Sequence, residues 1–421
     1  MAQSIAVAEH ATVAEHATVA EPTLTDPGPS IGVVGGGQLA LMLASAAQQL
    51  HVPLHVQTPG VHDPATALAT SVVLADLDDI AATRELARRC SAITFENEWV
   101  DLPALAPLSF DGVSFLPSLE ALSPLVSKRS QRQLLQQLGL PTPRWCDLPS
   151  DGVLPEGFAY PLMAKASTGG YDGKGTAVLQ GPEDLQALLA RIAAKDWILE
   201  ELVLFELELS QLACRDRAGN LQCYPLVQTH QHHQVCDWVL APASVPQAVQ
   251  AYARNIAASL LTAINYVGVL SIELFYGPGG LQVNEIAPRT HNSGHVTIEA
   301  ALTSQFEQQV RIVAGLPMGP VALQVPGALM VNLLGFESSD ADFQEQRDAL
   351  AALPDATVHW YGKQGSSPGR KLGHVTLLLE GSSPPEREYQ AQLLLEQVRR
   401  IWPLPPVAAP IAKPPSPVTP D

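Results

Sequence analysis

The chain has 421 residues, of which 46% are hydrophobic and 16% are charged, and this length exceeds what one hydrophobic core usually serves, so two or three domains are expected. The sequence contains no stretch of about 18 uninterrupted apolar residues, which argues against a membrane span. The formal net charge of −18 would repel a nucleic-acid backbone, although a local basic cleft could still hold a small phosphate.

The cysteines and the chain ends indicate the compartment. Five cysteines are scattered without a CxxC pair, so neither a disulfide framework nor a zinc site is indicated, and a reducing cytoplasm is expected. Residues 1–29 contain the tandem repeat VAEHATVAEHATVAEP, which lacks the basic start and the apolar core of a secretory signal. We expect a disordered tail there, with a docking segment as the alternative. Residues 403–421 are rich in proline and predict a second solvated tail.

The first folded segment begins with SIGVVGGGQLALML, a short apolar strand followed by three glycines and an amphipathic helix. The stretch satisfies G-x-G-x-x-A, the dinucleotide fingerprint. A dinucleotide enzyme also needs an acidic residue about 20 positions further on, but the second strand ends near Gln57 and the first acid is Asp63. We therefore favour a βαβ unit that binds another phosphate, and a purely structural glycine turn stays open.

A later strand, AITFEN, ends in Glu96, Asn97 and Glu98. Ligands of open α/β sheets bind outside the carboxyl ends of the strands. These carboxylates could therefore accept hydrogen bonds from ribose hydroxyls. The alternative is a solvated strand end.

The segment YPLMAKASTGGYDGKGTAVLQ predicts a strand, a glycine-rich connection and a second strand. It does not match the P-loop, because no helix follows and Lys174 is succeeded by Gly175. A mobile flap carrying a positive charge is the favoured interpretation. A flexible hairpin would explain the glycines but not Lys174 together with Lys165.

Two acidic segments follow. DWILEELVLFELELS places Glu200 and Glu208 around apolar positions, which suits either the ribose side of a purine pocket or a solvated acidic edge. In GVLSIELFYGPGGLQVNEI, the turn YGPGG predicts a hairpin that brings Glu273 opposite Asn284 and Glu285. Carboxylate oxygens from two strands suit Mg²⁺. Two like charges on a buried strand pair would otherwise be costly.

Two further polar clusters are candidates for sites. PRTHNSGH combines Arg289, His291 and Asn292, side chains that can hold a small oxyanion such as bicarbonate, or can serve as loop hydrogen-bond partners. The stretch QTHQHHQ contains His230, His232 and His233. Their spacing lacks a metal signature, so we favour a polar hairpin over a metal site.

Taken together, these motifs resemble those of a known family. MAKASTGGYDGKGT, ILEELVLFELELS, IELF with VNEIAPRTHNSGH, and YGKQGSSPGRKLGH are similar to the successive motifs of the ATP-grasp 5-(carboxyamino)imidazole ribonucleotide synthetases (N5-CAIR synthetases) of purine (IMP) biosynthesis. The similarity runs from about Ile31 to Leu377 and includes GGGQL and the FENE segment.

The resemblance implies an α/β fold with α+β elements: a Rossmann-like N-terminal domain, a two-lobed ATP-grasp domain and a small β-rich C-terminal domain. The implied boundaries are a tail at 1–29, domains at 30–125, 126–315 and 316–402, a flap at about 145–205, and a tail at 403–421.

The resemblance also implies the site residues. For ATP these are Lys128, Lys165, Glu200, Val203, Glu208, Asn284 and Glu285, and for Mg²⁺, or Mn²⁺ as an alternative, Glu273 and Glu285. For aminoimidazole ribonucleotide they are Gln38, Glu96, Tyr171, Lys174, Arg370 and Lys371, together with Asp172 and Lys363. The implied catalytic set is Asp172, Arg289, His291, Asn292 and Lys363, with the last four holding bicarbonate and then carboxyphosphate.

The implied activity is a cytoplasmic carbon–nitrogen ligase that carboxylates aminoimidazole ribonucleotide with bicarbonate and ATP, working as a homodimer on small molecules without nucleic acid or membrane. Another ATP-grasp ligase, such as a formate-dependent glycinamide ribonucleotide transformylase, is the alternative within the enzyme class. A non-catalytic nucleotide sensor and a nicotinamide-dependent dehydrogenase are the rivals from other classes.

Overall fold

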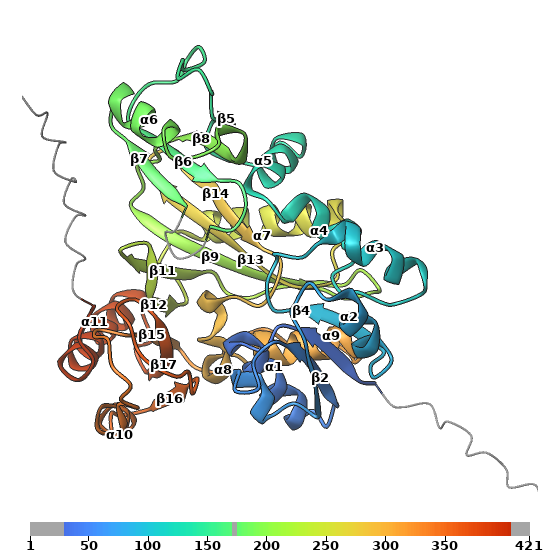
Figure 1. Cartoon of the computed structure of the whole chain (residues 1–421). Helices are drawn as coiled ribbons and strands as arrows, with labels where there is room; N and C mark the ends of the chain where they lie inside the picture. Colours follow the sequence, from blue (N-terminus) through green and yellow to red (C-terminus); the bar gives the residue numbers. More distant parts are fainter. Residues whose placement is uncertain (1–28, 171–174, 406–421) are drawn as a thin grey trace, which may run out of the picture.

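The structure is a computed structural model that describes residues 29–170 and 175–405. Most of both expected tails, together with Tyr171, Asp172 and Lys174, lies outside the described residues. Figure 1 shows three regions: an N-terminal α/β unit, a small sheet at the far end of the molecule, and a long sheet that runs between them into the C-terminal segment.

The N-terminal unit is a parallel sheet in the order β3-β2-β1-β4. Its first strand, the glycine turn and the first helix occur where the sequence predicts them, because the apolar side chains at helical spacing pack onto the sheet. The predicted parallel strand AITF is confirmed beside β1. The elements are β1 (Ile31–Val34), α1 (Gln38–Gln49), β2 (Leu54–Thr58), β3 (Ser71–Leu74), α2 (Ile80–Ala87), β4 (Ala92–Phe95) and α3 (Leu102–Phe110).

A short connection leads to the small sheet, which has the order β5-β8-β6-β7. The predicted strand, glycine-rich connection and second strand are confirmed as β6 and β7, which pair antiparallel. Helix α6 packs on this sheet through buried leucines. The elements are α4 (Leu119–Leu122), α5 (Lys128–Gln137), β5 (Trp145–Asp147), β6 (Leu162–Ala166), β7 (Thr176–Leu179), α6 (Pro182–Leu189) and β8 (Trp197–Glu201).

The long sheet has the order β14-β13-β9-β11-β12-β15-β17-β16, with β10 paired to β9. Helices α5 and α7 cover its first half over the largest apolar core. Its elements up to residue 315 are β9 (Leu207–Arg215), β10 (Leu221–Cys223), β11 (Val227–His232), β12 (Val235–Ala241), α7 (Gln247–Ala263), β13 (Gly268–Gly277), β14 (Gly280–Ala287), α8 (Thr297–Ala300) and α9 (Gln305–Val313).

The C-terminal strands do not form a sheet of their own. Strand β15 pairs with β12, so the C-terminal segment continues the central sheet while keeping a separate core around Trp402. The predicted β-rich segment is therefore joined to the ATP-grasp region by main-chain hydrogen bonds. Its elements are β15 (Gly327–Leu334), α10 (Gln344–Ala351), β16 (Ala356–Trp360), β17 (Lys371–Leu379) and α11 (Pro384–Ile401).

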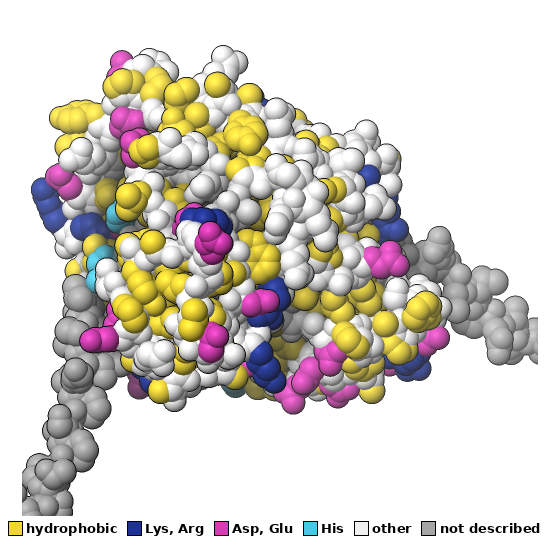
Figure 2. Space-filling view, turned by 90° about the horizontal axis from the view of Figure 1, so that it is seen from above, with side chains coloured by type: hydrophobic (Ala, Val, Ile, Leu, Met, Phe, Trp, Pro, Cys, Tyr) yellow, Lys and Arg dark blue, Asp and Glu magenta, His cyan; other side chains and the backbone are white. Residues whose placement is uncertain are grey.

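Apolar contacts fix the N-terminal unit against the rest of the chain. Helices α1 and α9 pack together, and Phe306, Val310 and Tyr361 complete the core beneath α1. On the face shown in Figure 2, Lys and Arg side chains stand in small groups among Asp and Glu. Among the described residues, none of the helices combines the length and apolar character needed to cross a bilayer.

Candidate functional site

The hairpin of β13 and β14 brings two carboxylates face to face. Glu273 and Glu285 are direct partners in the antiparallel register, as the sequence predicts, and a bulge follows Glu273. Burial, with the charges of Glu285 and Glu208, raises the pKa of Glu273 to about 7. Burial also pushes the pKa of Glu285 upward, but Lys128, with Lys165 and Arg132, outweighs burial and lowers it. The site thus favours a bound positive charge between the two strands.

Lys128 supplies one such charge. It is the first residue of α5, and its Nζ lies 2.6 Å from Glu285 Oε1, with the lysine side chain only 11% exposed. The main chain holds the lysine in place, because its N–H donates to the carbonyl of Ser167 (2.7 Å) at the end of β6. A predicted ATP residue therefore joins a predicted metal ligand.

A second polar cluster lies between the small sheet and the hairpin. Lys165 Nζ lies 2.8 Å from Glu200 Oε2 and donates to Asn284 Oδ1 (2.9 Å). These three residues were all predicted to contact ATP, and the structure brings them together. Burial lowers the pKa of Lys165, opposed by the charge of Glu200.

Arg132 belongs to the same cluster and was missed by sequence reasoning. Its Nε lies 2.6 Å from Glu200 Oε1, and its Nη2 donates to the carbonyl of Asn284 (2.6 Å). Burial raises the pKa of Glu200, but Lys165 and Arg132 outweigh burial and bring it to about 2. The signal was available: Arg132 stands on the buried side of α5, with Leu135 three positions further on, and a buried arginine requires an acidic partner.

The remaining predicted nucleotide residues flank this cluster. Glu208 lies on β9, and burial raises its pKa to about 7, opposed by His230. Val203 lies partly buried in the connection between β8 and β9. The connection from β8 to β9 links the small sheet to the long sheet (Figure 1).

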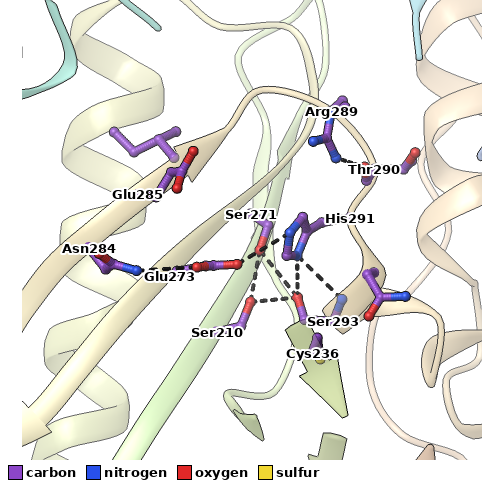
Figure 3. A network of polar contacts seen from close by, with 12 residues as sticks. Ser210, Cys236, Ser271, Glu273, Asn284, Glu285, Arg289, Thr290, His291 and Ser293 are labelled. Carbon is purple, nitrogen blue, oxygen red and sulfur yellow. Dashed lines mark hydrogen bonds and ion pairs between the residues drawn. The ribbon is translucent and has the colours of Figure 1, made fainter. Parts of the chain in front are cut away.

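Arg289 and His291 lie beside the opposed carboxylates. Arg289 Nε lies 2.6 Å from Glu98 Oε2, so the second acid of the FENE segment holds the guanidinium. His291 Nε2 lies 3.3 Å from Glu273 Oε1 (Figure 3). Burial, with Arg289 and Lys371 nearby, lowers the pKa of His291 well below its ordinary value.

Asn292 takes part in a buried amide pair. Its amide and that of Asn332 exchange hydrogen bonds of 2.9 and 2.7 Å in a buried pair. The side chain thus ties the PRTHNSGH segment to β15, and this tie uses one donor and the acceptor of the Asn292 amide. His295 of the same segment is fully buried against Phe306 and His374.

Predicted substrate residues from opposite ends of the chain meet at the N-terminal unit. Lys363 Nζ donates to Gln38 Oε1 (2.6 Å) and to the carbonyl of Lys371 (2.9 Å). Arg370 lies on the same C-terminal loop, where its Nη1 donates to the carbonyl of Gly365 (2.7 Å). Gln38 and Lys363 are therefore direct neighbours.

The glycine turn binds a side chain of the chain itself. The N–H groups of Gly37, Leu39 and Ala40 donate to the Glu96 carboxylate at 2.6, 3.0 and 3.3 Å. A Cβ on Gly35, where φ is +125°, would lie 2.4 Å from Glu96 Cβ. The prediction of a phosphate at this turn is wrong for this conformation, because a carboxylate already occupies the N–H groups at the helix start.

Gln57 is structural rather than a ribose ligand. It is fully buried, its Nε2 donates to the carbonyl of Asp76 (2.7 Å), and its Oε1 accepts from Thr83 (2.8 Å). The missing acid at this position and the occupied glycine turn both weigh against a dinucleotide site.

Comparisons with known proteins cover all three regions. Family models match residues 29–124 (ribonucleotide synthetase preATP-grasp domain), 133–306 (ATP-grasp domain) and 328–383 (phosphoribosylaminoimidazole carboxylase C-terminal domain). An N5-carboxyaminoimidazole ribonucleotide synthase from Synechococcus elongatus is 53% identical over 381 residues, which cover 90% of this chain and 96% of the relative. This chain belongs to the N5-carboxyaminoimidazole ribonucleotide synthase family.

Solved structures of the family agree with the fold. An Aspergillus clavatus N5-carboxyaminoimidazole synthase in complex with ADP and 5-aminoimidazole ribonucleotide has a TM-score of 0.80 and 28% identity, covering 89% of this chain and 99% of that one. The Thermus thermophilus synthetase has a TM-score of 0.79 and 32% identity, covering 90% and 100%. The predicted fold class is confirmed, and the chain is an ATP-grasp ligase.

The donor set of this family member fits a divalent cation. Mg²⁺ prefers carboxylate and amide oxygens and is bound through one or two carboxylates plus phosphates. Glu273 and Glu285 supply opposed carboxylates, and burial together with the charge of Glu285 raises the pKa of Glu273, so a cation placed between the two would be stabilised. Asn284 lies between them and the nucleotide-side cluster, with its Nδ2 donating to Glu273 Oε2 (3.4 Å).

The three clustered histidines lie on the predicted polar hairpin, formed by β11 and β12. His230 stacks on Trp238, His232 and His233 meet edge to face, and His233 lies in the turn with a φ of +49°. Within residues 29–170 and 175–405, no group of three or more His, Cys, Asp or Glu side chains has the geometry of a metal site.

Proposed function

We propose that the chain carboxylates 5-aminoimidazole ribonucleotide with bicarbonate and ATP, giving N5-carboxyaminoimidazole ribonucleotide, ADP and phosphate. The observation that carries the proposal is the meeting of the opposed carboxylates with an oxyanion-binding group, in which His291 Nε2 lies 3.3 Å from Glu273 Oε1. The reaction named for the family and the ADP and ribonucleotide complex of the Aspergillus clavatus relative support it.

The nucleotide would lie between the small sheet and the β13–β14 hairpin. The residues assigned to it are Lys128, Lys165, Glu200, Val203, Glu208, Asn284 and Glu285. Among them, Lys128 pairs with Glu285 and Lys165 pairs with Glu200. Glu273 and Glu285 would hold Mg²⁺ or Mn²⁺. When bound, the cation neutralises charge on the transferring phosphoryl group.

Bicarbonate would bind beside the γ-phosphate, held by Arg289, His291, Asn292 and Lys363. A bicarbonate oxygen attacks the γ-phosphorus, the bond to the β-phosphate oxygen breaks, and ADP leaves. Carboxyphosphate forms in this step. Glu98 fixes Arg289 through an ion pair of 2.6 Å, so the guanidinium is positioned before the substrate arrives.

The ribonucleotide would bind at the edge of the N-terminal unit through Gln38, Glu96, Tyr171, Lys174, Arg370 and Lys371. Its exocyclic amine attacks the carboxyl carbon of carboxyphosphate or of CO₂ released from it, phosphate departs, and Asp172 accepts the amine proton or orients the amine. Water must be excluded because carboxyphosphate hydrolyses, which suits a glycine-rich flap. We expect Asp172→Ala to reduce ribonucleotide-dependent turnover more than ATP binding.

An ADP-release assay with each substrate omitted in turn tests the reaction. We expect ADP only when bicarbonate, ribonucleotide and Mg²⁺ are all present, and ADP formation indifferent to the ribonucleotide would refute the proposal. Replacing bicarbonate with formate tests the alternative, a formate-dependent glycinamide ribonucleotide transformylase. Glu285→Gln should abolish turnover, whereas Glu307→Gln, which removes a carboxylate paired with Arg311 on α9, serves as the matched control.

The proposed organisation is a division at 30–125, 126–315 and 316–402, with the flap at about 145–205. The small sheet from β5 to β8 supports the flap range. We place the enzyme in the cytoplasm as a homodimer that acts on small molecules without nucleic acid. Light scattering of the purified chain tests the dimer.

A further inference from the structure

Three serine hydroxyls form a buried cluster behind His291 (Figure 3). Ser210 and Ser271 are 0% exposed and Ser293 is 1% exposed. Ser210 Oγ lies 2.8 Å from Ser271 Oγ and 2.7 Å from Ser293 Oγ, and Ser271 Oγ lies 3.4 Å from Ser293 Oγ. Ser293 Oγ lies 2.9 Å from His291 Nδ1. The cluster is therefore a hydrogen-bonded path that ends on one nitrogen of His291.

The strand register explains why the hydroxyls meet. Ser271 and Glu273 lie two positions apart on β13, so their side chains share a face of the sheet. Ser210 on β9 is the register partner of Glu273. Ser293 reaches the same face from a short helical turn, Asn292–Gly294, whose N-cap is His291. The serines and Glu273 thus flank His291 on its two sides.

The number of available protons fixes which group donates in each hydrogen bond of the serine cluster. The backbone N–H of Ser293 donates to His291 Nδ1 (3.3 Å), and a backbone amide can only donate. Nδ1 must therefore be an acceptor, so the Ser293 hydroxyl also donates to it. Ser293 Oγ then accepts from Ser210, and Ser210 accepts from Ser271. Because Nδ1 accepts and carries no proton, the ring proton lies on Nε2, which faces Glu273 Oε1 at 3.3 Å.

We propose that Ser293, supported by Ser210 and Ser271, is a positioning residue that fixes His291 as the Nε2–H tautomer and presents this group as a hydrogen-bond donor at the carboxylate site. Metal-ligating carboxylates and histidines commonly depend on such outer hydrogen bonds for orientation. The arrangement leaves Nε2 unable to accept a proton.

The consequence for catalysis rests on the proposed function. An Nε2–H group can donate to a bicarbonate or carboxyphosphate oxygen and to Glu273, but it cannot act as a base at that atom. His291 would then bind and orient the oxyanion, and proton removal would fall to another residue. Loss of the Ser293 hydroxyl frees the ring to turn or to change tautomer.

The tautomer can be measured without any variant. In protein labelled with nitrogen-15 at histidine, long-range proton–nitrogen spectra distinguish a protonated from an unprotonated ring nitrogen, and His291→Gln identifies the signals of His291 by their loss. We expect wild-type Nε2 to be protonated and Nδ1 to be unprotonated. A wild-type ring protonated at Nδ1 would overturn the proposal, and so would a Ser293→Ala ring with an unchanged tautomer and unchanged kinetics.

Kinetics supply the second measurement. We expect Ser293→Ala to lower kcat/KM for bicarbonate by about 10- to 100-fold while the KM for ATP stays near the wild-type value, with a smaller loss in Ser271→Ala, which lies further from the ring. Thr83→Val is the matched control, because it removes another buried hydroxyl, far along the chain in α2. Equal losses in Ser293→Ala and Thr83→Val would refute a positioning role.

The two proposals fail differently. If wild-type ADP release does not depend on bicarbonate, the proposed function is wrong, while the tautomer spectrum still tests the serine path. If Ser293→Ala does not fold, Ser271→Ala and the wild-type spectrum decide the question.

Discussion

Arg132→Met tests whether a buried ion pair holds the nucleotide-side cluster together. The Arg132 and Glu200 side chains are 1% and 2% exposed, and Nε and Oε1 lie 2.6 Å apart. Methionine fills a similar volume without charge. The variant therefore removes one partner of a desolvated pair and leaves the other in place.

The expected loss in the free energy of unfolding follows from the burial of this ion pair. Removing one partner of a buried ion pair typically costs about 3–5 kcal/mol, because the remaining charge is left uncompensated. Lys165 still lies 2.8 Å from Glu200 and reduces this cost. The lost hydrogen bond to the carbonyl of Asn284 adds about 1–3 kcal/mol. We expect the free energy of unfolding to fall by about 4 kcal/mol.

Urea denaturation monitored by circular dichroism measures the loss, and a double-mutant cycle with Glu200→Gln isolates the pair. The double variant should be less destabilised than the sum of the two single variants by about 2 kcal/mol or more, since residues in one ion-pair network are not additive. The KM for ATP should rise in Arg132→Met, because Glu200 and Lys165 lose their fixed geometry.

Arg84→Met is the matched control. Arg84 and Asp111 lie 2.8 Å apart, close to the 2.6 Å of the buried pair, but their side chains are 46% and 55% exposed, so the loss should stay below about 1 kcal/mol. If Arg132→Met costs no more than Arg84→Met, or if the cycle shows additivity, the reasoning from burial is wrong.

Three further predictions concern the glycine turn after β1, stability at acid pH, and the proposed ribonucleotide site. Gly35→Ala should lower the melting temperature, because its φ of +125° is strained for alanine and the new Cβ would lie 2.4 Å from Glu96 Cβ; an unchanged melting temperature would contradict the close approach. Burial raises the pKa of Glu200, but its two basic partners bring it to about 2. The stabilisation from these ion pairs is complete above the pKa of about 4.5 that the carboxyl has in the unfolded chain, and it should be lost as the pH falls from about 4.5 toward 2. The midpoint of urea denaturation, measured across this pH range, should fall in the wild type and fall less in Glu200→Gln. Lys363→Met should raise the KM for ribonucleotide without changing the KM for ATP, because Lys363 bonds to Gln38 at the proposed ribonucleotide edge; an equal rise in both would contradict that placement.

The local elements were predictable because their signals are local. The β1–α1 unit follows from apolar spacing and three glycines, and the β13–β14 hairpin follows from two apolar runs around YGPGG. The facing of Glu273 and Glu285 followed from that hairpin. The family resemblance supplied the order of the domains, and the comparisons confirm the family and the fold class.

Partners far apart in the chain were not predictable from periodicity. Arg132 and Glu200 are 68 positions apart, Arg289 and Glu98 are 191 apart, and Lys363 and Gln38 are 325 apart. Such pairs form only where separately folded layers dock, since a polar pattern specifies which face is buried but not which opposite charge meets it.

The sequence by itself determined the β1–α1 unit with its glycine turn, the strands around the glycine-rich connection, and the hairpin that carries Glu273 and Glu285. The tertiary structure alone decided what those glycines accommodate, because only the parallel docking of β4 beside β1 brings the Glu96 carboxylate onto the N–H groups of α1. The tertiary structure likewise decided which ring nitrogen of His291 carries the proton, because the three serines that fix the tautomer come from separate segments of the chain.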